Sequence, residues 1–175
     1  MRLLAFIGVI AIIVAIAAAV FFLGGFYNIS ATVEDPGIVN WVLIRTRMAS
    51  INQHATDQAP SNLGDLSMVQ AGARAFLQRG CPACHGAPGV EWQKFSEGLR
   101  PDPPDLKDIV NDLEPRQLFW VVKNGIRMTG MPSFGAIGVD DKEIWSIAAF
   151  LKKLPTVSDT DFKSWTAGPA PSGNP

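Results

Sequence analysis

The feature that most constrains this chain is the pentapeptide C-P-A-C-H at residues 81–85. Two thiols three positions apart can each add to a vinyl group of haem and form a thioether, and the imidazole that follows reaches the iron as proximal ligand. A thioredoxin-like site requires a strand before the motif, and none is expected there. A structural zinc site needs four ligands, but the chain has 2 cysteines and 2 histidines in all. The pattern predicts one covalently bound haem c, attached through Cys81 and Cys84 and ligated by His85.

A low-spin electron carrier needs a second axial ligand, and two methionines downstream of His85 are candidates, Met128 and Met131. Met131 precedes Pro132, whose fixed φ stiffens the loop, and one expected helix separates it from His85. Thioether ligation opposite a histidine raises the reduction potential. We expect Met131 to bind the iron and Met128 to fill a gap in the core.

The first residues predict a membrane anchor. Residues 3–26 form an apolar run without charge, long enough to cross a hydrocarbon core of about 30 Å. Arg2 precedes the run, and acidic residues follow it, so the N-terminus is expected in the cytoplasm and the rest outside. A cleaved signal peptide ending near residues 17–19 is the alternative. The apolar run continues beyond that site, which favours an uncleaved anchor.

A second helix is expected from Asp35-Pro36 to about Ala55. Its apolar positions recur at three- and four-residue steps and predict an amphipathic helix near the membrane. It can pack on the haem domain, lie among lipid headgroups or dock on other subunits of a membrane complex. The stripe consists of Trp41, Ile44, Met48 and Ile51.

The chain is therefore expected to have four parts. Residues 1–30 form the transmembrane anchor, 31–66 the amphipathic helix and a linker, 67–155 the haem c domain, and 156–175 a flexible tail. Within the tail, Phe162 and Trp165 are candidates to anchor it to the domain. The haem domain is expected to contain three longer helices, within 67–79, 114–124 and 140–154, and no strand. The formal net charge of −1 gives no indication of nucleic-acid binding.

Three segments together resemble class I cytochromes c: C-P-A-C-H-G at 81–86, G-M-P-S-F at 130–134, and a closing helix over 144–154. The resemblance covers about half of the chain. It implies an all-α fold in which the first and last helices of the domain pack together, near Gly72. It also implies that a proline carbonyl accepts a hydrogen bond from Nδ1 of His85, with Pro103 and Pro104 as candidates.

The preceding anchor and helix look like those of membrane-tethered bacterial monohaem cytochromes. The resemblance implies electron transfer without a catalytic residue of the protein, between redox proteins that the sequence does not identify. The chain is then a tethered carrier, or a subunit of an oxidoreductase complex, in the bacterial plasma membrane with its haem domain in the periplasm. A gas-binding or peroxidase-like function is the alternative, and it requires an open or labile sixth site.

Overall fold

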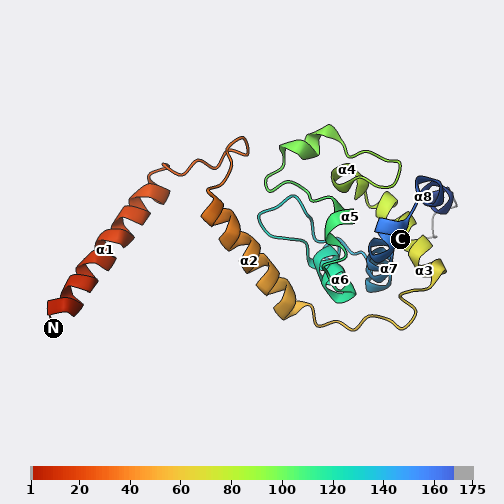
Figure 1. Ribbon diagram of the computed structural model, residues 1–175, viewed down its shortest axis with the longest axis horizontal. Coiled ribbons are helices and arrows are strands. Elements are labelled where there is room, and N and C mark those ends of the chain that lie inside the picture. The colour runs from red at the N-terminus through yellow and green to blue at the C-terminus, as the bar shows by residue number, and fades with distance from the viewer. Residues whose placement is uncertain (1, 168–175) are drawn as a thin grey trace. The chain divides into compact units, whose positions relative to one another are not determined.

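The computed structural model describes residues 2–167, which divide into two units, residues 2–35 and 36–167 (Figure 1). Regular structure in the described residues is helical, and the sole β interaction among them is an isolated bridge between Ala87 and Val90. The prediction of an all-α protein is confirmed.

The first unit consists of α1 (Arg2–Leu23) and the segment that follows it. This helix has 22 residues, with no charge after Arg2, and its described side chains are all exposed. At about 1.5 Å per residue it is long and apolar enough to cross a bilayer. It ends before the expected residue 26, because Gly25 turns the chain with a φ of +75°. The expected N-terminal apolar helix is confirmed.

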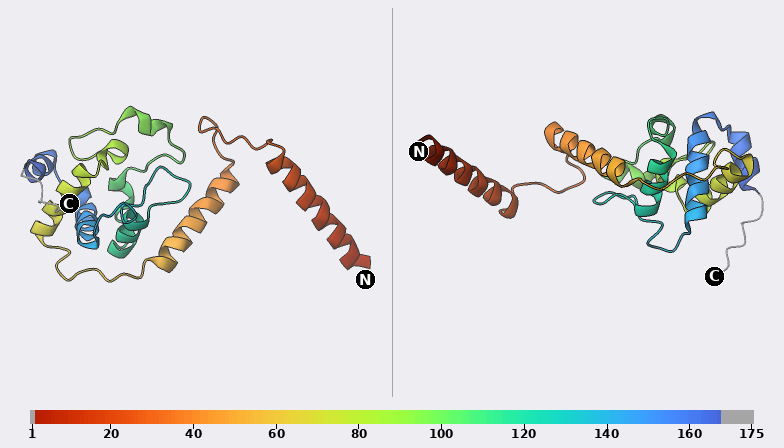
Figure 2. Two further views of the ribbon diagram at one scale, coloured as in Figure 1. Left: turned by 180° about the vertical axis from the view of Figure 1, so that it is seen from behind. Right: turned by 90° about the horizontal axis from the view of Figure 1, so that it is seen from below.

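The second unit begins with α2 (Gly37–His54), which joins the rest of the unit at its C-terminal end. Ile51 is buried there, and Nε2 of Gln117 donates a hydrogen bond to Oδ1 of Asn52 at 2.5 Å. The first turns of the helix stand clear of the other helices of the second unit (Figure 2). Trp41 and Ile44 are exposed, whereas Ile51 is buried, so the four stripe residues do not form one exposed docking surface.

The amphipathic pattern expected for α2 is also wrong for its first half. Apolar side chains surround the helix between residues 38 and 44, while its second half is mainly polar. The three- and four-residue spacing was real, but the intervening residues Val42 and Leu43 are apolar too. Polarity therefore changes along the axis of this helix more than across it.

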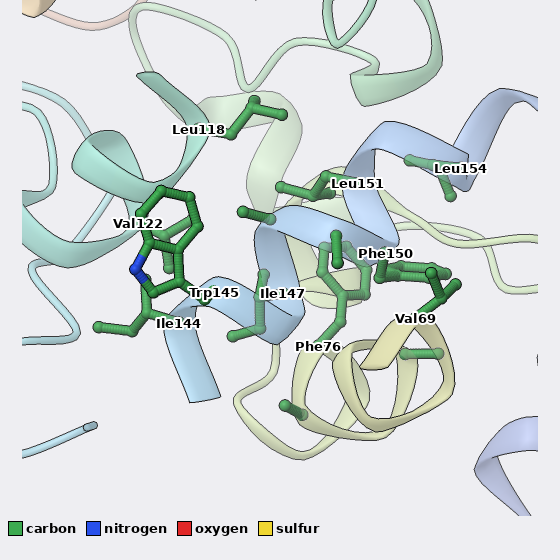
Figure 3. Packing of buried hydrophobic residues seen from close by; sticks show 14 of the residues in the cluster. Val69, Phe76, Leu118, Val122, Ile144, Trp145, Ile147, Phe150, Leu151 and Leu154 are labelled. Atoms are coloured by element: carbon green, nitrogen blue, oxygen red, sulfur yellow. The ribbon is translucent and has the colours of Figure 1, made fainter. Parts of the chain in front are cut away.

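The core of the second unit forms around α7 (Asp141–Lys153), which packs against α3 (Leu66–Gln78) and α6 (Pro115–Asn124). Its residues 144–151 are all buried. Gly72 of α3 lies against the backbone of Ser146, and the rings of Phe76 and Phe150 are 5.3 Å apart (Figure 3). The two helices approach closely because Gly72 has no side chain.

Shorter helices complete the unit. The segment between the C-P-A-C-H motif and α6 is mostly irregular, as expected, but it contains two short helical stretches. The remaining elements before residue 157 are α4 (Pro82–His85), η1 (Lys94–Gly98), α5 (Leu106–Ile109) and η2 (Leu154–Thr156).

The expected flexible tail is partly wrong. Residues of α8 (Asp159–Thr166) form a helix that packs on α3, with the hydroxyl of Ser158 capping its first turn by accepting from the amide of Asp161. Phe162 is 2% exposed, with its ring 5.6 Å from that of Phe150. Trp165 is partly buried against the same core, so the two aromatic residues expected as anchors both contact the domain. Residues 168–175 of the expected tail lie outside the described residues.

Candidate haem-binding site

The C-P-A-C-H motif follows directly from the end of α3. Gly80 takes a φ of +76°, and the amide of Cys81 donates to the carbonyl of Phe76 at 3.2 Å, which closes the last turn of the helix. Pro82 then begins α4, where a missing N–H is tolerated because the first amides of a helix have no partner within it. The core helix α3 thereby fixes the position of the motif.

Both cysteines lie on one side of this turn. Cys81 and Cys84 are three positions apart, and the amide of His85 donates to the carbonyl of Cys81 at 3.0 Å, so the segment is a true helical turn. The two thiols are free and partly buried. Burial raises the pKa of Cys81 to about 12, so its thiol is protonated at neutral pH. Two adjacent free thiols are the donor set that two thioether bonds to one porphyrin require.

The ring of His85 is oriented by a backbone carbonyl. Its Nδ1 lies 3.0 Å from the carbonyl oxygen of Pro104. A carbonyl can only accept, so Nδ1 carries the proton and the lone pair on Nε2 is available to a metal. Burial lowers the pKa of His85, although the Pro104 carbonyl opposes this, and a low pKa favours the neutral imidazole that binds iron. Of the two candidate prolines, Pro104 makes the contact.

Pro104 is held in place by the helix that follows it. Asp105 caps α5 by accepting a hydrogen bond from the amide of Lys107 at 2.8 Å, and Leu106 is buried in the core. The position of the His85 ring therefore depends on the anchoring of this short helix. An aspartate directly before a leucine, as in Asp105-Leu106, is a helix-start pattern that the sequence analysis did not use.

The segment that carries Met131 is fixed by hydrogen bonds on both sides. Thr129 Oγ1 donates to the carbonyl of Ile126 at 2.7 Å and accepts from the amide of Met131 at 3.1 Å. Ser133 Oγ donates to the carbonyl of Lys123 at 2.7 Å. The hydroxyl groups on either side of Met131 thus bind the loop to itself and to the end of α6. Both hydroxyls were missed as site residues, although each is two positions from Met131.

The two candidate methionines differ in environment. Met131 is partly buried and packs against the hydrophobic core, as Cys81 also does. Met128 is 86% exposed and has a φ of +60°, in the left-handed region. The expectation that Met128 fills the core is wrong, because its left-handed backbone leaves the side chain in solvent.

A hollow of about 350 Å³ adjoins His85. Its lining includes Trp92, Asp105 and Lys107, but not Cys81, Cys84 or Met131. It shares Asp105 with the turn that orients Nδ1. This hollow therefore lies beside His85 and does not reach Met131 or the two cysteines.

One further residue supports the site from outside the motifs. Nζ of Lys152 on α7 donates to the carbonyls of Val110 and Leu113, at 2.7 and 2.9 Å. These carbonyls follow α5, so the contact ties the segment around Pro104 to the core helix. Neither spacing nor composition identifies such a contact, because the acceptors are backbone atoms about forty positions away.

The comparisons with known proteins agree with this arrangement. Residues 67–151 match the model of a family described as cytochrome c oxidase, cbb3-type, subunit III. No curated protein and no solved structure matches the chain. The matched residues contain the C-P-A-C-H turn, the Met131 loop and nearly all of α7. They form a class I cytochrome c domain.

A cytochrome c domain of this class binds haem c and serves in electron transfer. The residues of the C-P-A-C-H turn fit that group, since they provide two free thiols and an imidazole whose Nε2 is left available. The protein holds and orients the group. The match ends before η2 and α8, and it begins after α1 and α2, so these elements are additions to the domain.

Proposed function

We propose that this protein is a membrane-tethered monohaem cytochrome c that transfers single electrons. In this proposal Cys81 and Cys84 attach one haem, and His85 and Met131 are its axial ligands. The haem supplies the one-electron redox chemistry when bound, and no side chain of the chain makes or breaks bonds. The difference between the two methionines carries the assignment of the sixth ligand: Met131 is packed and hydrogen-bonded at its amide, whereas Met128 is exposed.

Optical spectra of the purified protein test this proposal. We expect a low-spin c-type spectrum in both oxidation states, a weak far-red band from methionine–iron(III) ligation, and no response to carbon monoxide. Met131→Ala should abolish the far-red band and lower the potential, while the matched variant Met128→Ala should keep both. A high-spin spectrum or rapid carbon monoxide binding in the unaltered protein would instead indicate a gas-binding or peroxidase-like protein.

The number of haems is tested separately. The chain has only 2 cysteines, and both lie in one C-P-A-C-H motif, which supports a single attachment site. We expect a mass increase equal to one haem, lost in a Cys81→Ala/Cys84→Ala variant. A larger ratio of haem to protein would contradict the monohaem assignment.

We further propose that α1 spans the bacterial plasma membrane with its N-terminus in the cytoplasm and the cytochrome domain outside. Arg2 at the first position of the helix, and Glu34 and Asp35 as the first charges after it, support this orientation. Protease added to spheroplasts should degrade the haem domain. Protection of the domain until the membrane is broken would show the opposite orientation, with the domain in the cytoplasm.

The electron donor and acceptor are redox proteins, and the chain acts as a carrier or as a subunit of a membrane redox complex. The description of the matched family as an oxidase subunit supports the second form. Solubilisation in mild detergent distinguishes the two. A carrier should migrate alone, whereas a subunit should remain with other redox proteins.

A further inference from the structure

The first half of α2 is apolar on every side and lies outside the core of its own domain. Its large apolar side chains Ile38, Trp41, Val42, Leu43 and Ile44 are between 40% and 68% exposed. Successive residues of a helix are about 100° apart, so these positions point in all directions round the axis. Asn40 is the only polar residue among 38–44.

This distribution favours lipid over a single docking partner as the surroundings of the segment. A helix that docks on one partner buries a stripe and keeps its other side polar, whereas a helix apolar all round is surrounded by apolar material. Residues 38–44 make about two helical turns and are about 10 Å long, too short to span a hydrocarbon core of about 30 Å but long enough to enter its outer boundary. Charges bound the segment on both sides, Glu34 and Asp35 before it and Arg45 and Arg47 after it.

The chain also keeps this segment near the membrane. Residues 24–36 connect α1 to α2, and thirteen extended residues span roughly 45 Å at most. Trp41 has the guanidinium of Arg45 over its ring, 5.8 Å from the centroid. A tryptophan beside an arginine is suited to the headgroup level, where an apolar body and a charged tip are both accommodated.

The second half of the same helix is fixed to the cytochrome domain. Ile51 and Ala55 are buried, and Asn52 accepts from Gln117 on α6. Gln117 Oε1 in turn accepts from the amide of Glu114, which caps α6. The helix that carries the apolar segment is thus held against α6, the helix that leads into the Met131 loop.

We infer that residues 38–44 insert into the outer boundary of the lipid bilayer and that α2 thereby sets the orientation of the cytochrome domain on the membrane. This inference rests on the proposed membrane tether. It implies that the domain does not swing freely on its linker. Its haem side is presented to partners at a fixed height and tilt, so those partners have a redox centre near the membrane surface.

The test is photo-crosslinking of the full-length holoprotein in native membranes and in nanodiscs of phosphatidylcholine and phosphatidylglycerol. A photoreactive benzoylphenylalanine replaces Leu43 in one variant and Gln53, ten positions later on the same helix, in the matched control. We expect lipid adducts by mass spectrometry at position 43 and at least tenfold fewer at position 53.

Other outcomes overturn the inference. Adducts from position 43 to a second copy of the chain, or to another protein in native membranes, would make the segment a protein interface. The absence of any adduct at position 43 would show that this residue lies in water. Equal lipid adducts at both positions would show that α2 lies flat on the membrane. Failure of the tether is distinguishable from these, because a chain without its anchor is released by alkaline washing.

Discussion

The amide nitrogen of Ile126 lies 3.2 Å from the carbonyl oxygen of Met131. This hydrogen bond closes the Met131 loop onto the end of α6. Gly125, between the helix and Ile126, has a φ of +68°, and a Cβ at this position would lie 2.6 Å from the carbonyl carbon of Pro132. The proposed sixth ligand is therefore positioned by a glycine that the loop directly contacts.

We predict that Gly125→Ala displaces the loop. The new methyl group would overlap the backbone of residues 131–133. The conformation of Gly125, with a φ of +68° and a ψ of −172°, itself costs an alanine about 1–3 kcal/mol. The far-red methionine–iron(III) band should weaken or disappear, and the midpoint of chemical denaturation should fall. Absorption spectra and denaturant titration measure the two effects.

Gly138→Ala is the control for that experiment. Gly138 also has a positive φ, +87°, but a Cβ there would meet no atom within 4 Å. The Gly138→Ala variant should have a free energy of unfolding lower by about 1–2 kcal/mol and should retain the far-red band. A Gly125 variant with the same modest loss and an intact band would show that the loop does not depend on the contact.

A second prediction concerns the contact between α3 and α7. A Cβ on Gly72 would lie 1.8 Å from the carbonyl oxygen of Ser146 and 2.9 Å from Cβ of Phe150. Backbone atoms cannot rotate away, so Gly72→Ala should separate the helices and lower the free energy of unfolding by about 3 kcal/mol or more. Gly64→Ala, where no atom lies within 4 Å, should change it by less than about 0.5 kcal/mol in the same denaturant titration. Equal stability of the two variants would refute the close approach.

The importance of Gly72 could be predicted from the sequence, and so could the C-P-A-C-H turn, because both depend on local spacing. A helix start, a glycine on an apolar face and a five-residue motif are properties of neighbouring residues. The helical class followed from the same patterns. The assignment of Cys81, Cys84, His85 and Met131 as haem-binding residues remains a prediction until it is tested by spectroscopy.

Other features depend on contacts that no local pattern records. Phe162 was expected as an anchor of the tail, but the helix α8 around it was missed, because this helix packs on a core formed by distant residues. Lys152 was missed because its acceptors are main-chain carbonyls. The polarity of α2 was misjudged because a search for one apolar face ignored Val42 and Leu43, which are apolar and lie off that face.

We predict that Lys152→Met destabilises the domain. The substitution removes two charge-assisted hydrogen bonds and leaves the carbonyls of Val110 and Leu113 without their donor, at a cost of about 2 kcal/mol. Denaturant titration should show a lower midpoint with an unchanged m value. Lys153→Met removes the same charge from the same helix end but is exposed, so its effect should be within about 0.5 kcal/mol. If both variants unfold at the same midpoint, the contribution of Lys152 is its charge near the helix end and not its contact with the carbonyls.

The last prediction concerns α8, which lies outside the residues that match the cytochrome family. Phe162 is 2% exposed and packs on Phe150 at the centre of the core. Phe162→Ala should leave a cavity and lower the free energy of unfolding by about 3–5 kcal/mol. The neighbouring Lys163→Ala, at an exposed position, should have little effect. The far-red band should persist in both variants, because α8 packs on α3, which does not carry Met131. Loss of stability shows as a lower denaturation midpoint, and an unchanged midpoint in Phe162→Ala would mean that the domain is complete without α8.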